Sequence, residues 1–186
     1  LVIADIAGKG MAAALLMANL QANLRSQCAT ATEQLNKFLR SVNQLFFENT
    51  ADSDYATFFF SEYNDASRRL RYANCGHLPA LLLRRDGSLE RLSSTATVLG
   101  LFNQWDCALE ECQLFPGDTL FLYTDGATES FNDSGEEFGD HRLIESLHRH
   151  RALSPRALID SVVDDVRRFN PGEQRDDITL IVGQVR

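Results

Sequence analysis

The sequence predicts an α+β fold in which pairs of helices precede and follow a run of antiparallel strands. Apolar residues recur at helical spacing in two stretches near the start of the chain and in two more near its end. The middle of the chain instead shows short alternating or continuous apolar runs separated by turn residues, which is typical of strands. Because strands and helices do not alternate one by one, the order argues against a doubly wound parallel sheet.

Length, composition and charge narrow the class of protein. The chain has 186 residues, which favours one domain over 1–186, and 44% of them are apolar, as in ordinary soluble proteins. The net charge of −8 argues against nucleic acid or an anionic membrane as the main partner. No apolar run could span a bilayer and no secretory signal is present, so we expect a cytoplasmic protein. We also expect its cysteines, none of them in a C-x-x-C pair, to be free buried thiols.

The first part of the chain contains a strand and two helices. The apolar run "LVIAD" predicts a short buried strand that ends at Asp5, and the glycine loop "IAGKG" follows it. A helix is predicted over 11–29, and Thr30 with Glu33 forms a capping box for the next helix. The apolar positions expected to face the core are Met11, Leu15, Leu16, Leu20, Leu24 and Cys28 in the first helix and Leu35, Phe38, Leu39, Val42, Leu45 and Phe46 in the second.

Strands dominate the middle of the chain. The stretches 55–64 and 70–76 are predicted to pair through a turn over 65–69, and 79–92 is a hairpin closed by Asp86-Gly87. The alternation in "CALEECQL", 107–114, predicts a half-buried strand.

The last part of the chain repeats the pattern of strand, helix pair and strand. A buried strand in "DTLFLYTDGATES" leads directly into Asp125 and Gly126. Helices are predicted over 140–150 and 154–169, the second with Ser154 as N-cap and proline at its first position. The stretch 176–185 is the final strand.

Aspartates stand where the predicted strands meet loops. Asp5 ends the first strand, Asp125 follows the buried one, and Asp176 and Asp177 precede the last. If these ends meet at one rim, the carboxylates repel one another unless a cation neutralises them, and oxygen ligands favour magnesium, manganese or calcium over zinc. Asp125-Gly126 could equally be a plain turn, each of the other sites could be as ordinary, and spacing alone does not separate the two interpretations.

Five motifs occur in an order that resembles a known family. They are "DIAGKGMAAALLMA", "YATFF", "ANCGHLPALLLRRDG", "GDTLFLYTDGATE" and "RDDITLIV". Together they resemble the metal-dependent PPM-type (protein phosphatase 2C-like) fold, and more narrowly its bacterial sporulation-protein-E-like (SpoIIE-like) branch. The resemblance covers nearly the whole chain. It implies two packed antiparallel β-sheets flanked by helix pairs, an αββα sandwich.

The resemblance also implies a site and an activity. Asp5 matches the aspartate that bridges two Mn²⁺ or Mg²⁺ ions, and Ile6 the residue whose backbone carbonyl joins the first ion. Asp125 and Asp176 match the carboxylates of the second ion, with Asp177 beside them. A metal-bound water would then hydrolyse phosphoserine or phosphothreonine without a protein nucleophile. The implied substrate is a phosphorylated anti-sigma-factor antagonist in bacterial signal transduction.

The chain departs from the family in two places. Relatives begin with further strands that carry a G-G-D-x-x-D-like motif with one metal ligand, and many eukaryotic relatives have a histidine where this chain reads "IAGK". We therefore expect a fragment of a longer, multidomain signalling protein that lacks the first strands, binds cations weakly and exposes a sheet edge able to form a homodimer. The alternatives are a catalytically silent adaptor of the same fold and a hydrolase of small phosphoesters.

Other conspicuous residues are interpreted as structural. His77 is expected to support a turn, and Trp105 and Phe102 to anchor a loop. "GKG" lacks the spacing of a phosphate-binding loop. We expect the remaining histidines, His141, His148 and His150, to be solvated, and Met11 and Met17 to fill the core.

Overall fold

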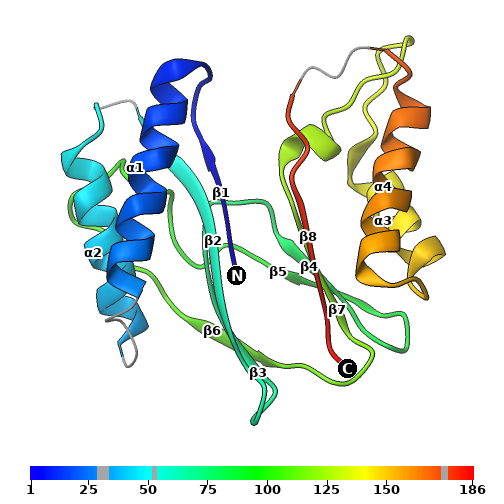
Figure 1. Cartoon of the computed structure of the whole chain (residues 1–186), viewed down its shortest axis with the longest axis horizontal. Coiled ribbons are helices and arrows are strands. Elements are labelled where there is room, and N and C mark those ends of the chain that lie inside the picture. The colour runs from blue at the N-terminus through cyan, green and yellow to red at the C-terminus, as the bar shows by residue number, and fades with distance from the viewer. Residues whose placement is uncertain (29–33, 52–53, 173–175) are drawn as a thin grey trace. The chain divides into compact units, whose positions relative to one another are not determined.

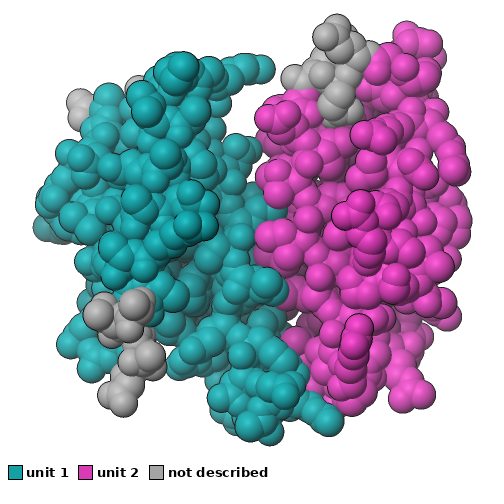
Figure 2. All heavy atoms as spheres, in the orientation of Figure 1, with its two compact units in different colours: residues 1–77, 93–113 teal, residues 78–92, 114–186 magenta. Residues whose placement is uncertain are grey.

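The computed structural model describes residues 1–28, 34–51, 54–172 and 176–186, and the chain divides into two compact units (Figures 1 and 2). Unit 1 comprises Leu1–His77 and Ser93–Gln113, and unit 2 comprises Leu78–Leu92 and Leu114–Arg186. Each unit contains an antiparallel sheet and a pair of helices, which confirms the predicted α+β class.

Unit 1 consists of a sheet in the order β1-β2-β3-β6 and two helices that lie side by side (Figure 1). Side chains along β2 alternate between the two faces of the sheet. Ala56, Phe58 and Phe60 lie on one face and pack with the apolar face of the second helix in the core of unit 1. On the other face of β2, Phe59 stacks on Tyr72 of β3. The elements are β1 (Val2–Ile6), α1 (Met11–Cys28), α2 (Leu35–Glu48), β2 (Ala56–Asn64), β3 (Arg69–Cys75) and β6 (Glu110–Gln113).

Unit 2 consists of a sheet in the order β5-β4-β7-β8 with a second helix pair. Every residue of β7 is buried, and Phe121 and Tyr123 pack with the apolar faces of both helices. Ser154 caps the second of these helices as predicted, because its side chain accepts a hydrogen bond from Ala157 N–H. The elements are β4 (Ala80–Leu83), β5 (Leu89–Leu92), β7 (Thr119–Tyr123), a short 3₁₀ helix (Asp125–Ala127), α3 (Gly139–His150), α4 (Pro155–Phe169) and β8 (Leu180–Gln184).

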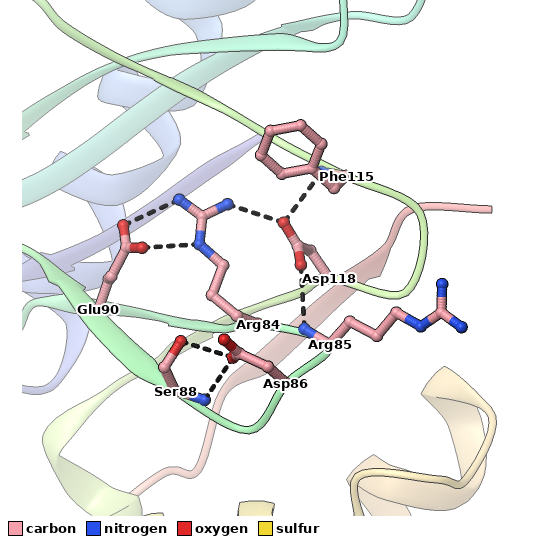
Figure 3. A network of polar contacts seen from close by, with 7 residues as sticks. All are labelled: Arg84, Arg85, Asp86, Ser88, Glu90, Phe115 and Asp118. Carbon is pink, nitrogen blue, oxygen red and sulfur yellow. Dashed lines mark hydrogen bonds and ion pairs between the residues drawn. The ribbon is translucent and has the colours of Figure 1, made fainter.

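A buried ion pair joins the β4–β5 hairpin to the start of β7 (Figure 3). The side chain of Asp118 is 3% exposed, and its Oδ2 lies 2.7 Å from Nη1 of Arg84. The same carboxylate accepts hydrogen bonds from the backbone N–H groups of Arg85 and Phe115. Arg84 also pairs with Glu90 across the hairpin at 2.7 Å. Sheet pairing is therefore supported here by polar contacts, at the end of β7 far from Asp125.

Helix α1 buries only part of its predicted face: Leu16, Leu20 and Leu24 lie in or against the core as expected. Leu20 is fully buried and Met17 packs against the core, but Met11 is 78% exposed and Leu15 is 65% exposed. Leu20 lies about two and a half turns after Met11, so the two point to opposite sides of the helix. Alanine and leucine occur all around this helix, and the apolar pattern alone therefore assigned the wrong side to Met11 and Leu15.

Three smaller expectations have mixed outcomes. The capping box of Thr30 and Glu33 lies outside the described residues, and α2 begins after Gln34 without a side-chain cap. The strand predicted over 107–114 forms only at Glu110–Gln113, because it is an edge strand whose partner in the described residues is β3. The cysteines are free, but they are not uniformly buried: Cys75 and Cys107 are buried, Cys112 is half-buried, and Cys28, at the end of α1, is exposed.

Among the described residues, no helix is long and apolar enough to cross a membrane.

Candidate metal centre

Strand β7 holds Asp125 at a fixed point. The strand is buried along its length, and Asp125 opens the 3₁₀ turn that follows Thr124. The backbone carbonyl of Asp125 accepts hydrogen bonds from the N–H groups of Thr128 and Glu129 at 2.8 and 2.7 Å. The Asp125 carbonyl is thus held by the turn that follows a buried strand, and the side chain of Asp125 is half-buried.

Thr124 fastens the segment before β8 alongside this turn. Its N–H donates to Thr179 O at 3.1 Å, and its Oγ1 accepts from Thr179 N–H at 3.0 Å. The same hydroxyl donates to Asp177 O at 3.2 Å. The β7–β8 register, which pairs Tyr123 with Leu180, continues into this contact. The segments that carry Asp125 and Asp176, which are far apart in the sequence, therefore lie side by side.

Gly126 allows the two segments to approach closely. A Cβ atom at this position would lie 2.3 Å from the carbonyl oxygen of Asp177 and 3.3 Å from that of Asp176. The side chain of Asp176 accepts a hydrogen bond from the N–H of Asp177 at 2.9 Å. The glycine of the "TDG" motif is therefore required by packing, and it brings Asp125 and Asp176 to the same end of the unit 2 sheet.

The carboxylates at this end of unit 2 interact electrostatically. Partial burial and then the charges of nearby carboxylates, first among them Asp125, raise the pKa of the Glu129 side chain. Asp176 contributes to the same shift. A divalent cation bound here would relieve this repulsion.

The other two predicted ligands, Asp5 and Ile6, lie in unit 1. Asp5 is half-buried and pairs with Thr57 in the β1–β2 register, and Ile6 pairs with Ala56. The side chain of Ile6 lies in the core, so only its backbone carbonyl could be a metal ligand. The prediction that all the aspartates meet stays a prediction. No group of three or more His, Cys, Asp or Glu residues that could hold a metal ion occurs within the described parts of the chain.

The donor chemistry of the candidate residues fits a hard cation. The available ligands are carboxylate and carbonyl oxygens, which suit magnesium, manganese or calcium better than zinc. Sequence reasoning selected these aspartates and the neighbouring Gly126 but overlooked Thr124 and Glu129. Both belong to the "TDGATE" stretch, so the motif itself contained the signal.

The remaining candidates have distinct environments. His77, expected to support a turn, is buried and donates its backbone N–H to Oδ1 of Asn74. Trp105 is buried with its Nε1–H donated to Thr97 O. Phe102, expected to anchor the loop, is instead 49% exposed. His150 was expected to be solvated, but it lies 3.1 Å from Oδ2 of Asp165 because α3 and α4 pack together. Of the other two, His141 is exposed and His148 is half-buried.

Comparison with known proteins gives one consistent family. The family described as "Stage II sporulation protein E (SpoIIE)" matches residues 1–186. "Phosphoserine phosphatase RsbU" of Bacillus subtilis is 29% identical over 183 residues, which cover 97% of this chain and 53% of RsbU. The chain therefore spans about half the length of this curated relative.

Solved structures agree on the fold. The SiaA-PP2C domain of Pseudomonas aeruginosa superposes with a TM-score of 0.86 at 20% identity, over 100% of this chain and 75% of that one. The RsbU and RsbW domains of Rv1364c from Mycobacterium tuberculosis give a TM-score of 0.82 at 25% identity, over 100% and 51%. The catalytic domain of the phosphatase PstP, solved with two manganese ions, gives 0.67 at 16% identity, over 100% and 87%.

Proposed function

The chain belongs to the Stage II sporulation protein E (SpoIIE) family, and from this premise we propose that it is a metal-dependent phosphoprotein phosphatase acting on phosphoserine or phosphothreonine. The observation that carries the proposal is the contact at Gly126, where Asp125 and the Asp176–Asp177 segment meet at the end of a buried strand. If Asp125-Gly126 were only a turn, there would be no need for a glycine that packs closely against a second segment with acidic residues.

The aspartates have separate roles in this proposal. Within unit 2, Asp125 and Asp176 hold one divalent ion. Within unit 1, Asp5 and the backbone carbonyl of Ile6 are further proposed metal ligands. Asp177 acts through its backbone, which Thr124 binds. Bound Mn²⁺ or Mg²⁺ would supply a water of lowered pKa as the nucleophile. The printed name of PstP, a phosphatase with two manganese ions, supports this choice of metal.

We propose a regulatory phosphoprotein, an anti-sigma-factor antagonist, as the substrate. The printed names of RsbU, a phosphoserine phosphatase, and of the joined RsbU and RsbW domains support this class.

We further propose that residues 1–186 form one phosphatase domain of a longer signalling protein, and that a segment before Leu1 supplies one more metal ligand. The 53% coverage of RsbU supports a longer protein.

Manganese titration tests the proposed function. The 186-residue chain and an N-terminally extended form would each be titrated by calorimetry and assayed for phosphate release from a phosphoserine peptide. We expect the extended form to bind manganese and hydrolyse the peptide, and Asp125→Asn to weaken both by at least about 100-fold, because loss of even an outer partner costs about 10–100-fold.

The control is Asp133→Asn, an exposed carboxylate in the turn after the site, which should behave as the parent. If the extended form neither binds manganese nor releases phosphate, the phosphatase proposal fails. The catalytically silent adaptor would then be the better interpretation.

An exposed sheet edge leads to a prediction about assembly. Strand β1 stands at one edge of the unit 1 sheet, and its strand partner in the described residues is β2. We propose that this edge pairs with a second copy, because unpaired backbone groups on an edge favour strand addition. Analytical ultracentrifugation of the 186-residue chain should show a dimer at micromolar concentration. A monomer at all concentrations would contradict the proposal.

A further inference from the structure

A buried histidine lies next to the strand that carries Asp5. His77 is 6% exposed, and its Nδ1 is 2.8 Å from Oγ1 of Thr57 on β2. Its backbone N–H donates to Oδ1 of Asn74, which is itself buried. The preceding Gly76 has a φ of +70°, and a Cβ there would lie 2.6 Å from Cγ1 of Val98. The turn therefore places the imidazole at one fixed position against Thr57.

The register places this pair beside Asp5. Thr57 is the direct partner of Asp5 in the antiparallel pairing of β1 with β2. Side chains of such partners lie on the same face of a sheet, with Cβ atoms about 4.5–5.5 Å apart. Ile6 is in the core beneath α1 and α2, and neighbouring residues of a strand point to opposite faces. Asp5 and Thr57 thus share the face turned away from these helices.

The stability of the fold does not require a threonine hydrogen-bonded to a histidine at this position. Along the same face, Phe59 is fully buried and stacks on Tyr72. A valine would fill the space of Thr57 and suits a strand equally well. His77 is buried and Thr57 is half-buried, and removing their polar groups from water costs free energy that their mutual hydrogen bond only offsets. A role toward Asp5 would explain why both are present.

We propose that His77 is a positioning residue for Asp5 and acts through Thr57. The Nδ1–H of His77 donates to Oγ1 of Thr57, so the hydroxyl hydrogen of Thr57 is directed toward the Asp5 carboxylate. This orients the carboxylate for a divalent cation before the cation binds. The inference rests on the proposed function and deepens it by adding the residues that prepare one ligand.

Manganese affinity measured without substrate tests the proposal. Calorimetry on the N-terminally extended form would compare the parent with Thr57→Val, which removes the hydroxyl but keeps the shape. We expect manganese binding to weaken by about 10–100-fold, as for other outer partners of metal ligands. The metal-free melting temperature should not fall, and Thr57→Ser should bind manganese as the parent does.

A second pair of variants separates positioning from turn support. His77→Leu removes the donor, whereas His77→Asn keeps an amide near the position of Nδ1. We expect weak manganese binding for His77→Leu and recovery for His77→Asn. The matched control is Ser61→Ala, two alternations along the same face of β2, whose buried hydroxyl has no hydrogen-bond partner in the described residues. Ser61→Ala should leave manganese binding unchanged.

The outcomes are distinguishable from failure of the proposed function. If the parent binds manganese and hydrolyses the peptide while Thr57→Val binds manganese equally well, the positioning role is wrong and the phosphatase proposal stands. If the parent binds no manganese, both proposals fall. Should His77→Leu not fold, the comparison of Thr57→Val with Thr57→Ser still decides the matter.

Discussion

Replacing Gly126 with alanine is expected to abolish manganese binding by the N-terminally extended form while leaving most of the fold intact. The new Cβ would lie 2.3 Å from a backbone oxygen of Asp177, and no side-chain rotation can relieve that contact. The segment carrying Asp176 must therefore move away from Asp125. Because a displacement of about 1 Å in a reacting group can cost about 100-fold in rate, we expect a loss of at least that size in both metal affinity and phosphate release.

Calorimetry and a phosphoserine-peptide assay measure this effect, and circular dichroism checks that the protein remains folded. Gly172→Ala is the matched control, since among the described residues the atom that its Cβ would meet is the Asn170 side-chain oxygen, at 3.2 Å. We expect this control to lose less than about 3-fold in manganese affinity, because a side chain can shift by a few tenths of an ångström. Parent-like affinity in Gly126→Ala would show that this contact does not position a ligand.

Asp118→Ala is expected to destabilise the chain by about 3–5 kcal/mol, because it leaves a largely buried arginine without one of its partners. Two backbone N–H groups, those of Arg85 and Phe115, lose their acceptor as well. Glu90 still pairs with Arg84, but its side chain is half-exposed, so it compensates only in part. Urea unfolding followed by circular dichroism measures the change in free energy of unfolding.

Two comparisons make the stability prediction specific. Asp106→Ala breaks the exposed pair with Arg40, and it should lower the free energy of unfolding far less than Asp118→Ala does. In the double variant Arg84→Met, Asp118→Ala the buried charge is gone, so part of the lost stability should return. Asp118 stands at the opposite end of β7 from Asp125, so manganese affinity of the folded Asp118→Ala protein should match the parent. A loss of stability below about 1 kcal/mol would show that the buried pair contributes little.

Most secondary structure could be predicted because it depends on local periodicity. The β4–β5 hairpin formed around Asp86-Gly87, and α4 began at the proline after Ser154, since turn and capping residues act within a few positions of themselves. Predictions were wrong where the apolar pattern fitted more than one arrangement, or where the partner of a side chain is distant in the sequence. Helix α1 is apolar on several sides, and the sequence could not choose which side faces the sheet. His150 was taken as solvated because its partner Asp165 lies on a different helix.

The order of the elements and the acidic residues at the ends of apolar strands can be read from the sequence, because both depend on neighbouring residues. Which of those ends lie together depends on the fold. The pairing of Tyr123 with Leu180 brings Asp177 against Gly126, and the pairing of Asp5 with Thr57 places His77 near a candidate ligand. Strand register is set by side chains packing across the sheet, between residues far apart in the chain, and no local pattern contains that information.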